Sequence, residues 1–314
     1  MITCYIVGWD GAQTALPALL DCKFSYGEGT PCDSFRVTCL WPEGNRELLE
    51  RATRFFVSED GTRRFTGVVD EYSLTMDKGG ATLALSGRGM AALLLDNQAE
   101  ARQYQTATWG DIFANHIAPY GIQTAGGVSL PPVNGFVVSS AGSEWQVLYD
   151  FACYHGGVEP RFDQSGHLVL AKPAGSVKLL DDRVAVTAME YRDKRYGVLS
   201  EVLVRDRGRK TVEKVTNAAF QKEGGRCRRV VTMPAKSDYR AMRYSGSYQL
   251  KKSAEGRRTL TLTVPCVFFT QVGDVITLRR KDWQLDGAWR VVSCETGLSG
   301  TGGGYTAFSM VPAG

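Results

Sequence analysis

The fold of this 314-residue chain is decided by two stretches, Phe65-Thr66-Gly67-Val68-Val69 and Gly287-Ala288-Trp289-Arg290-Val291-Val292. An Asp-Gly pair, typical of a tight hairpin turn, precedes the first stretch, and the glycine of a second pair, Asp286-Gly287, opens the second stretch. A glycine opens the next turn ten residues after Val69 and again ten residues after Val292. This spacing predicts that residues 53–88 and 272–311 are two copies of one antiparallel β pattern. The alternative is coincidence, since all-β proteins reuse hairpins.

Short strands are also predicted on both sides of these copies. Apolar residues alternate with polar ones over 2–7, 21–26 and 34–41, and strand-like runs return over 184–191, 198–205, 210–215 and 259–267. A short helix is expected over 46–51, and residues 253–258 look like a turn. The 35 glycines and 11 prolines agree with many short strands joined by turns. We therefore expect a mainly β protein.

The middle of the chain, residues 90–173, has a different character. A short helix is expected from Met90 to Asp96. Thr108 with Asp111, and Ser143 with Gln146, have the spacing of capping boxes that begin two further helices. Gly156-Gly157 ends the second of these helices, and a hairpin follows over 158–171. This pattern predicts a small α+β insertion between β-rich flanks.

Composition limits the class of protein. Hydrophobic residues make up 43% and charged residues 22%, as in folded soluble proteins. No apolar run approaches the roughly 20 residues of a membrane helix, so we expect no membrane insertion. No basic region precedes an apolar N-terminal stretch, so we expect no secretory signal and folding in the cytoplasm. The eight cysteines, several of them in strand-like runs, are expected to be buried reduced thiols.

Charge is distributed unevenly. Residues 192–258 hold 19 Lys+Arg and 7 Asp+Glu, a net of +12, whereas the rest of the chain has a net of −8. A basic block of this kind attracts nucleic acid or an acidic partner, or forms a solvated face. No nucleic-acid-binding motif accompanies it, which disfavours direct binding of nucleic acid.

Histidines are the first candidates for chemistry, and there are three. His116 lies beside Ile117 on an expected helix, so a packed or half-exposed histidine is favoured over a ligand. His155 lies two residues from Cys153, a spacing with no metal signature and one that points the two side chains apart on a helix. His167 opens a strand after a glycine turn and is expected to be exposed.

Other motifs give no catalytic apparatus. GxSxG, GxxxxGK[ST] and HExxH are absent from the sequence. Gly87-Arg88-Gly89 lacks the third glycine of a dinucleotide loop and is interpreted as a turn that opens a helix. Asp181-Asp182 and Asp70-Glu71 are adjacent carboxylates, which face opposite sides of a strand, and this disfavours a glycosidase. Trp283 and Trp289 flank a hairpin turn, where packing is favoured over a sugar-binding platform.

The order of these predicted strands, helices and turns along the chain resembles that of the baseplate hub proteins of contractile phage tails and tailocins, the late control protein D family. The resemblance covers nearly the whole chain and is weakest over 205–258. The segments that carry it are 65–69, 85–89 leading into 93–97, 108–109 with 117–122, 148–158, 162–170, 272–276 and the closing glycine-rich hairpin.

The resemblance implies a fold and a role. It implies two similar tube-like antiparallel β-barrel domains, at 1–95 and 176–314, around an α+β insertion domain at 96–175, with soft boundaries. It further implies a homotrimer whose six barrels adapt a six-fold tail tube to a three-fold central spike, because each face of a closed ring must satisfy one symmetry. It implies no enzyme activity, no catalytic, cofactor-binding or metal-binding residue, and no cofactor.

Expected partners are the tube protein, the spike protein, and other baseplate and tape-measure proteins, and a passing contact with DNA in the lumen is allowed. The expected location is a virion tail baseplate or tailocin particle, made in the bacterial host cytoplasm. Three alternatives stay open: a tail-associated glycan or peptidoglycan hydrolase, a carbohydrate-binding module, and a tube or terminator subunit with one barrel. Phage, bacteriocin and other injection particles are not distinguished.

Overall fold

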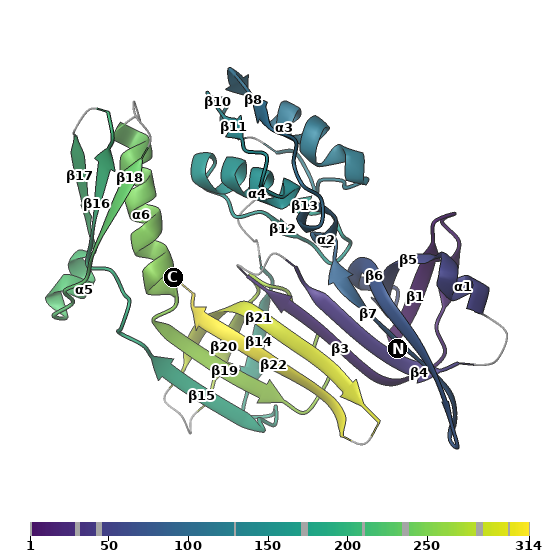
Figure 1. Ribbon diagram of the computed structural model, residues 1–314. Helices are drawn as coiled ribbons and strands as arrows, with labels where there is room; N and C mark the ends of the chain where they lie inside the picture. Colours follow the sequence, from purple (N-terminus) through teal and green to yellow (C-terminus); the bar gives the residue numbers. More distant parts are fainter. Residues whose placement is uncertain are drawn as a thin grey trace.

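The computed structural model of the chain describes residues 2–28, 32–41, 46–128, 130–170, 175–208, 211–233, 239–280, 285–300 and 302–313. Its main feature is one 13-stranded sheet formed by both ends of the sequence (Figure 1). The predicted mainly β fold with an α+β insertion is confirmed. Over the residues that the structure describes, the sheets are not closed.

The first β unit comes from the N-terminal residues. Its elements are β1 (Ile2–Gly8), β2 (Gln13–Ala15), β3 (Leu19–Gly27), β4 (Ser34–Leu40), α1 (Arg46–Arg51), β5 (Ala52–Glu59), β6 (Thr62–Asp77) and β7 (Gly80–Gly89). They pair in the order β3-β4-β7-β6-β5-β1-β2. Gly87-Arg88-Gly89 belongs to β7, so its interpretation as a turn was wrong. A Cβ at Gly87 would lie 2.0 Å from the Val68 carbonyl oxygen, so the glycine allows close approach of β6.

The second β unit comes from the C-terminal part of the chain. Its strands are β14 (Val177–Asp181), β15 (Ala188–Asp193), β19 (Arg258–Val264), β20 (Val275–Arg279), β21 (Gly287–Ser299) and β22 (Gly303–Pro312). They pair in the order β15-β19-β22-β21-β20-β14. The second half of β21 also pairs with β3, which joins the two units into one sheet. One hydrophobic core, which includes Phe24, Phe55 and Phe308, runs through both units.

The two predicted β copies have the same strand pairing. Strands β5-β6-β7 and β20-β21-β22 are both antiparallel meanders. In each, the central strand has a β-bulge against the third strand, between Val69 and Glu71 in β6 and between Val291 and Ser293 in β21. The bulges lie at the C-terminal ends of the two stretches that were matched in the sequence.

The insertion has its own core and lies above the middle of the sheet (Figure 1). Its helices are α2 (Ala92–Leu95), α3 (Trp109–His116), η1 (Ala118–Tyr120), α4 (Glu144–Tyr149) and a π-helical turn η2 (Asp150–His155). Its short strands are β8 (Arg102–Gln103), β9 (Thr106–Ala107), β10 (Val133–Asn134), β11 (Val137–Val138), β12 (Arg161–Phe162) and β13 (Leu168–Val169). The capping box at Thr108 is confirmed. At Ser143 only half of the expected box forms, because the Gln146 side chain donates to Asp150.

A third unit, which we call the basic arm (residues 199–255), departs from the sequence prediction. It contains β16 (Glu201–Asp206), β17 (Val212–Thr216), α5 (Ala218–Lys222), β18 (Arg228–Met233) and α6 (Tyr239–Glu255). The predicted turn over 253–258 was wrong in part, since α6 continues to Glu255. The arm is inserted between β15 and β19 and has a core of its own around Val202, Val204 and Met242.

Candidate functional site

His116 is the centre of a buried polar network in the insertion. Its Nδ1 lies 2.6 Å from Glu144 Oε2, and its Nε2 lies 3.0 Å from the Tyr104 hydroxyl. Tyr120 donates to the other oxygen of Glu144 at 3.2 Å. His116 and Glu144 are only 3% and 6% exposed, so a substrate does not reach them. The prediction of a packed histidine is confirmed. Glu144 was missed, because it follows the helix cap at Ser143, where a glutamate signals helix formation.

The other histidines do not form a catalytic pair. Cys153 is buried, and its sulfur lies 3.4 Å from the Tyr248 hydroxyl of α6. His155 packs edge-on against Phe136, and burial lowers its pKa. His167 is partly exposed and lies 3.5 Å from the Asp163 carboxylate. The structure therefore places Cys153 beside a tyrosine hydroxyl and His167 beside the Asp163 carboxylate, and neither contact joins a nucleophile to a histidine base.

The carboxylate pairs are bound by arginines instead of facing each other. Asp181 binds Arg183 at 2.6 Å, and Asp70 binds Arg88 at 2.7 Å. Arg88 also holds Asp96. No cluster of three or more potential metal-ligating side chains occurs in the part of the chain that the structure describes.

The tryptophans do not form an exposed platform in the described part of the chain. Trp289 is 7% exposed and donates to the Leu285 carbonyl oxygen at 3.3 Å. Trp283 lies outside the described residues. Among the cysteines, Cys4, Cys39 and Cys294 are buried as expected, whereas Cys266 is exposed. No described helix is long and apolar enough to cross a bilayer.

A cleft of about 950 Å³ lies where the β units, the insertion and α6 meet. In its lining, Arg161 Nε and Gln164 Nε2 are buried with no hydrogen-bond partner among the described residues. Burial raises the pKa of Asp33 to about 7, although the Gly27 amide donates to its carboxylate. The cleft is suited to packing between units, and its described lining offers no nucleophile paired with a base.

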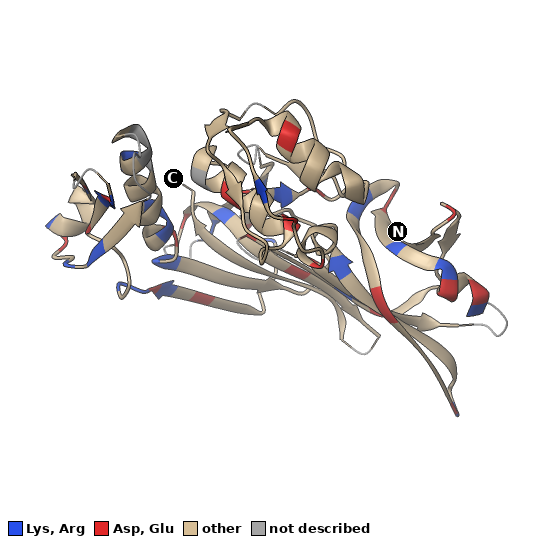
Figure 2. Cartoon of the chain, turned by 45° about the horizontal axis from the view of Figure 1, so that its top comes forward, with Lys and Arg blue, Asp and Glu red and all other residues tan. Residues whose placement is uncertain are grey.

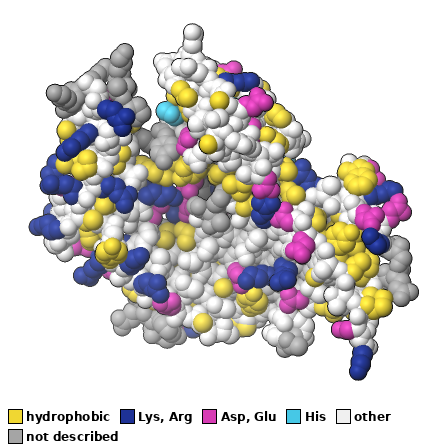
Figure 3. Space-filling model, in the orientation of Figure 1, with side chains coloured by type: hydrophobic (Ala, Val, Ile, Leu, Met, Phe, Trp, Pro, Cys, Tyr) yellow, Lys and Arg dark blue, Asp and Glu magenta, His cyan; other side chains and the backbone are white. Residues whose placement is uncertain are grey.

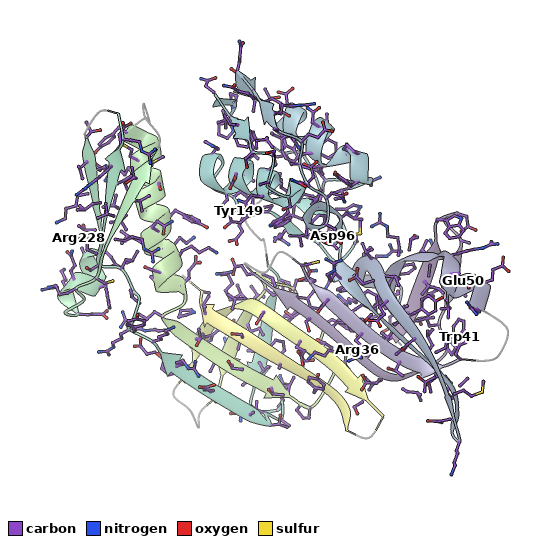
Figure 4. The ribbon with its side chains drawn as sticks, in the orientation of Figure 1. Arg36, Trp41, Glu50, Asp96, Tyr149 and Arg228 are labelled. Carbon is purple, nitrogen blue, oxygen red and sulfur yellow. The ribbon has the colours of Figure 1, made fainter. Side chains whose placement is uncertain are left out.

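Side-chain contacts join the arm to the insertion across this cleft. The Tyr149 hydroxyl lies 3.3 Å from that of Tyr248, and Lys252 pairs with Glu159 at 2.8 Å. Figure 4 shows Tyr149 at the side of the insertion that is turned toward α6. These contacts hold the arm against its own insertion.

A broad open face is formed by eight strands that are neighbours in the sheet. We call the strands β15-β19-β22-β21-β3-β4-β7-β6 the eight-strand wall. Its buried face carries residues such as Phe24, Leu85 and Leu262. Its open face carries mostly small side chains; among them are Thr259, Thr261, Thr263, Ser309, Ser293, Ser25, Thr38, Thr82, Ala84, Ser86, Ser73 and Thr75.

Charged side chains share the open face, among them Lys23, Arg36, Glu71, Glu190 and Glu295, and some are paired, as for Lys23 and Glu295 at 2.7 Å. In Figure 3 the sheet region is accordingly mostly white, with isolated blue and magenta groups. Arg36 lies on this face, on β4 (Figure 4). A broad sheet face with mostly small side chains is suited to lining a conduit. Sequence alternation alone could not distinguish it from an ordinary solvated face.

Both ends of the wall have unpaired edges in the described part of the chain. Strand β15 pairs only with β19. Strand β6 pairs with β5 only over Thr62–Val68, so beyond the bulge its residues pair with β7 alone. Unpaired strand edges are templates for pairing with another chain.

Comparisons with known proteins agree with this architecture. No family model and no curated protein matches the sequence. Among solved structures, the chain is similar to a tail protein from Neisseria meningitidis MC58 (TM-score 0.76, 18% identity, covering 100% of this chain and 97% of that chain). It is equally similar to the 43 kDa tail protein of prophage MuSo2 from Shewanella oneidensis (TM-score 0.76, 17% identity, 99% and 98%).

A third neighbour is an E. coli component of the type VI secretion system (TM-score 0.58, 12% identity, covering 94% of this chain and 74% of that chain). It is described as structurally similar to the T4 bacteriophage tail proteins gp27 and gp5. At these identities the likeness shows the fold. The chain therefore has a fold found in phage tail and type VI secretion proteins.

Proposed function

We propose that this chain is a structural hub of a tail baseplate, in which three copies join edge to edge into a ring that adapts a six-fold tube to a three-fold spike. The observation that carries the proposal is a repeated row of paired residues across the wall. In the first unit, the row consists of Lys23 on β3, Arg36 on β4, Ser86 on β7 and Glu71 on β6. In the second unit, the matching row is Glu190, Thr261, Ser309 and Ser293 on β15, β19, β22 and β21.

The two rows end differently. Ser293 continues the second row into the first unit, where it pairs with Gly27 of β3. Glu71 occupies the same place in the first row, beside the unpaired edge of β6. We place β15 of a second copy against the free edge of β6 in the same register that β3 has against β21 within the chain. In this register Glu71 lies opposite Lys194 of the second copy, and Leu74 lies opposite its Tyr191. The wall has eight alternating strands, so this closing contact is antiparallel like all the others.

The residues brought together in this register complement each other. Leu74, Met76 and Tyr191 are 44%, 71% and 42% exposed in the single chain. In the proposed register Leu74 lies opposite Tyr191 and Met76 opposite Met189, all on the core side of the sheet. Glu71 lies opposite the exposed Lys194. Apolar cross-strand pairs and opposite charges both stabilise antiparallel strands.

Three copies joined in this way make a continuous wall of 24 strands. With strands about 4.8 Å apart, the ring is about 37 Å across for upright strands and wider with tilt. The small polar face of the wall then lines the lumen. Six similar β units face the tube and three chains face the spike, so one ring meets both symmetries.

The fold similarity to phage tail and type VI secretion proteins supports a structural tail role. On this proposal the partners are the tube protein on one face, the spike protein on the other, and a tape-measure protein or DNA in the lumen. None of the described candidate residues favours a hydrolase or a sugar-binding module.

A cysteine pair tests the ring. Directly opposite residues of antiparallel strands have Cα atoms about 4.5–5.5 Å apart, within the range of a disulfide. The variant with Leu74→Cys and Tyr191→Cys is expected to oxidise into covalent trimers on a non-reducing gel. The single variants report any background from the native thiols.

The matched control combines Thr75→Cys with Tyr191→Cys, because Thr75 points to the opposite face of β6. It is expected to give little product. Cross-linking confined to dimers, an open ladder of larger species, or equal product from both pairs would count against a closed three-copy ring.

A further inference from the structure

The basic arm exposes one face of its small sheet. Its strands are ordered β17-β16-β18, and α6 packs against β16 and β17 on one side. The opposite side carries Leu203, Val212 and Val230, the last two 52% and 48% exposed. Strands β16 and β18 are parallel. Parallel strands are normally covered on both faces, so a second covering layer is expected here.

Charged side chains surround this apolar centre. Arg205, Lys214 and Arg228 lie on the open face, and Glu201 is held between the last two, 2.8 Å from Lys214. The pKa of Glu201 is lowered by its hydrogen bonds to Lys214 and Arg228. Arg205 lies on the same face beside Val212. The surface thus has an apolar centre and a positive rim, as in a protein–protein interface.

The chain itself offers an acidic counterpart. Residues 1–175 contain 12 Lys+Arg and 19 Asp+Glu, a net of −7, whereas residues 176–314 contain 25 and 14, a net of +11. The insertion alone (96–175) has 3 and 7, a net of −4, and the arm has 14 and 6, a net of +8. In Figure 2 many blue segments, which mark Lys and Arg, lie on the arm, whereas red segments, which mark Asp and Glu, appear on the insertion. A head-to-tail ring places the basic half of each copy beside the acidic half of the next.

Position in the ring supports the same pairing. The insertion begins after the end of β7 at Gly89, and the arm begins after the end of β15 at Asp193. Because β7 and β15 run in the same direction, both units extend from the same edge of the ring, where these strands end. Within one chain, the ends of β7 and β15 are six strand spacings of about 4.8 Å apart, about 29 Å. Across the proposed β6–β15 contact, the end of β7 in one copy and the end of β15 in the next are only two spacings apart, about 10 Å. Arg228 lies on the side of the arm away from its own insertion (Figure 4).

From these observations we propose that the open face of β17-β16-β18 docks on the α+β insertion of the adjacent copy. The proposal rests on the ring put forward under Proposed function. Each arm then lies between two insertions: α6 contacts its own, and the open sheet face contacts the neighbour's. The periphery of the ring alternates basic and acidic units, and each copy is held at the wall and again at the rim.

Nucleic acid is the less suitable occupant of this surface. The centre is aliphatic and, among the described residues, offers no aromatic side chain for stacking a base. Two of its three cations already bind Glu201, which leaves little free charge for phosphates.

The test uses the full chain carrying Leu74→Cys and Tyr191→Cys, oxidised into trimers. A photoreactive benzophenone side chain replaces Val230 on the open face. On illumination we expect a cross-link between copies whose peptides map to residues 96–175. A benzophenone at Lys251, which lines the cleft on α6, is expected to cross-link to the insertion of its own chain. Adding Arg205→Glu is expected to lower the yield at position 230 about fivefold.

The outcomes separate the two proposals. If the disulfide trimer forms but position 230 reacts only within its own chain, with co-purified nucleic acid, or not at all, the docking surface is refuted and the ring stands. If the disulfide trimer does not form, the ring is refuted and the docking proposal falls with it. A cross-link at position 230 that maps to residues 1–95 of the neighbour also refutes docking on the insertion.

Discussion

Replacing Leu74 and Met76 by serine is expected to weaken the trimer and leave the single chain folded. Full burial of a Leu or Met side chain is worth about 1.5–3 kcal/mol. These two are 44% and 71% exposed in the chain, so covering them by β15 of the next copy contributes about 2 kcal/mol per contact. A closed ring has three such contacts, and the loss is about 6 kcal/mol, or about 10⁴-fold in the association constant.

The midpoint concentration of a monomer–trimer equilibrium varies inversely as the square root of the association constant, so it should rise about a hundredfold. Sedimentation velocity over a concentration series measures the midpoint, and circular dichroism melting checks the fold. The matched control replaces Val177 and Leu179 on β14, which are 73% and 48% exposed. Equal weakening by both double variants, or none by Leu74→Ser with Met76→Ser, would refute the reasoning.

Three further predictions concern the single chain. Gly87→Ala should destabilise the first β unit by about 2–3 kcal/mol in urea unfolding, because the new Cβ meets the Val68 carbonyl oxygen and the Phe35 ring, whereas Gly79→Ala at an exposed turn should cost little. Glu144→Leu should lower the stability of the insertion by about 2–4 kcal/mol, since His116 and Tyr120 lose a buried partner; Glu100→Gln on the surface is the control, and equal melting temperatures would contradict the buried network. The fold favours the neutral form of Asp33, whose pKa is raised to about 7, so this group lowers stability as the pH rises from about 4 to about 7. Asp33→Asn should therefore stabilise the chain at pH 8 relative to pH 5, by on the order of 1 kcal/mol, and a pH-independent difference in melting temperature would argue against a buried, neutral carboxyl.

The sequence predicted the repeated β pattern because its signals are local. The glycine pairs and the Asp-Gly turns specify hairpins directly, and the strands around Val69 and Val291 formed as expected. The capping box at Thr108 was predictable for the same reason. Gly87-Arg88-Gly89 was misassigned because a glycine that admits close strand packing looks like a turn when its neighbours in space are unknown.

The candidate functional surface was less predictable. Alternation places Leu74 and Met76 on one face, but it does not tell that β5 ends before them and leaves their edge unpaired. The pairing of Ser293 with Gly27 joins residues from opposite ends of the chain, which no local pattern specifies. In the basic arm, α6 was missed because the high density of charge hides its apolar stripe.

The most direct test of the central claim is an electron-microscopy map of the purified assembly viewed along its axis. The account predicts a closed three-fold ring with six β units, a continuous wall of 24 strands and the side chains of Thr261 and Arg36 in the lumen. A ring of six chains, an open filament, or a ring in which β6 and β15 remain unpaired would contradict it.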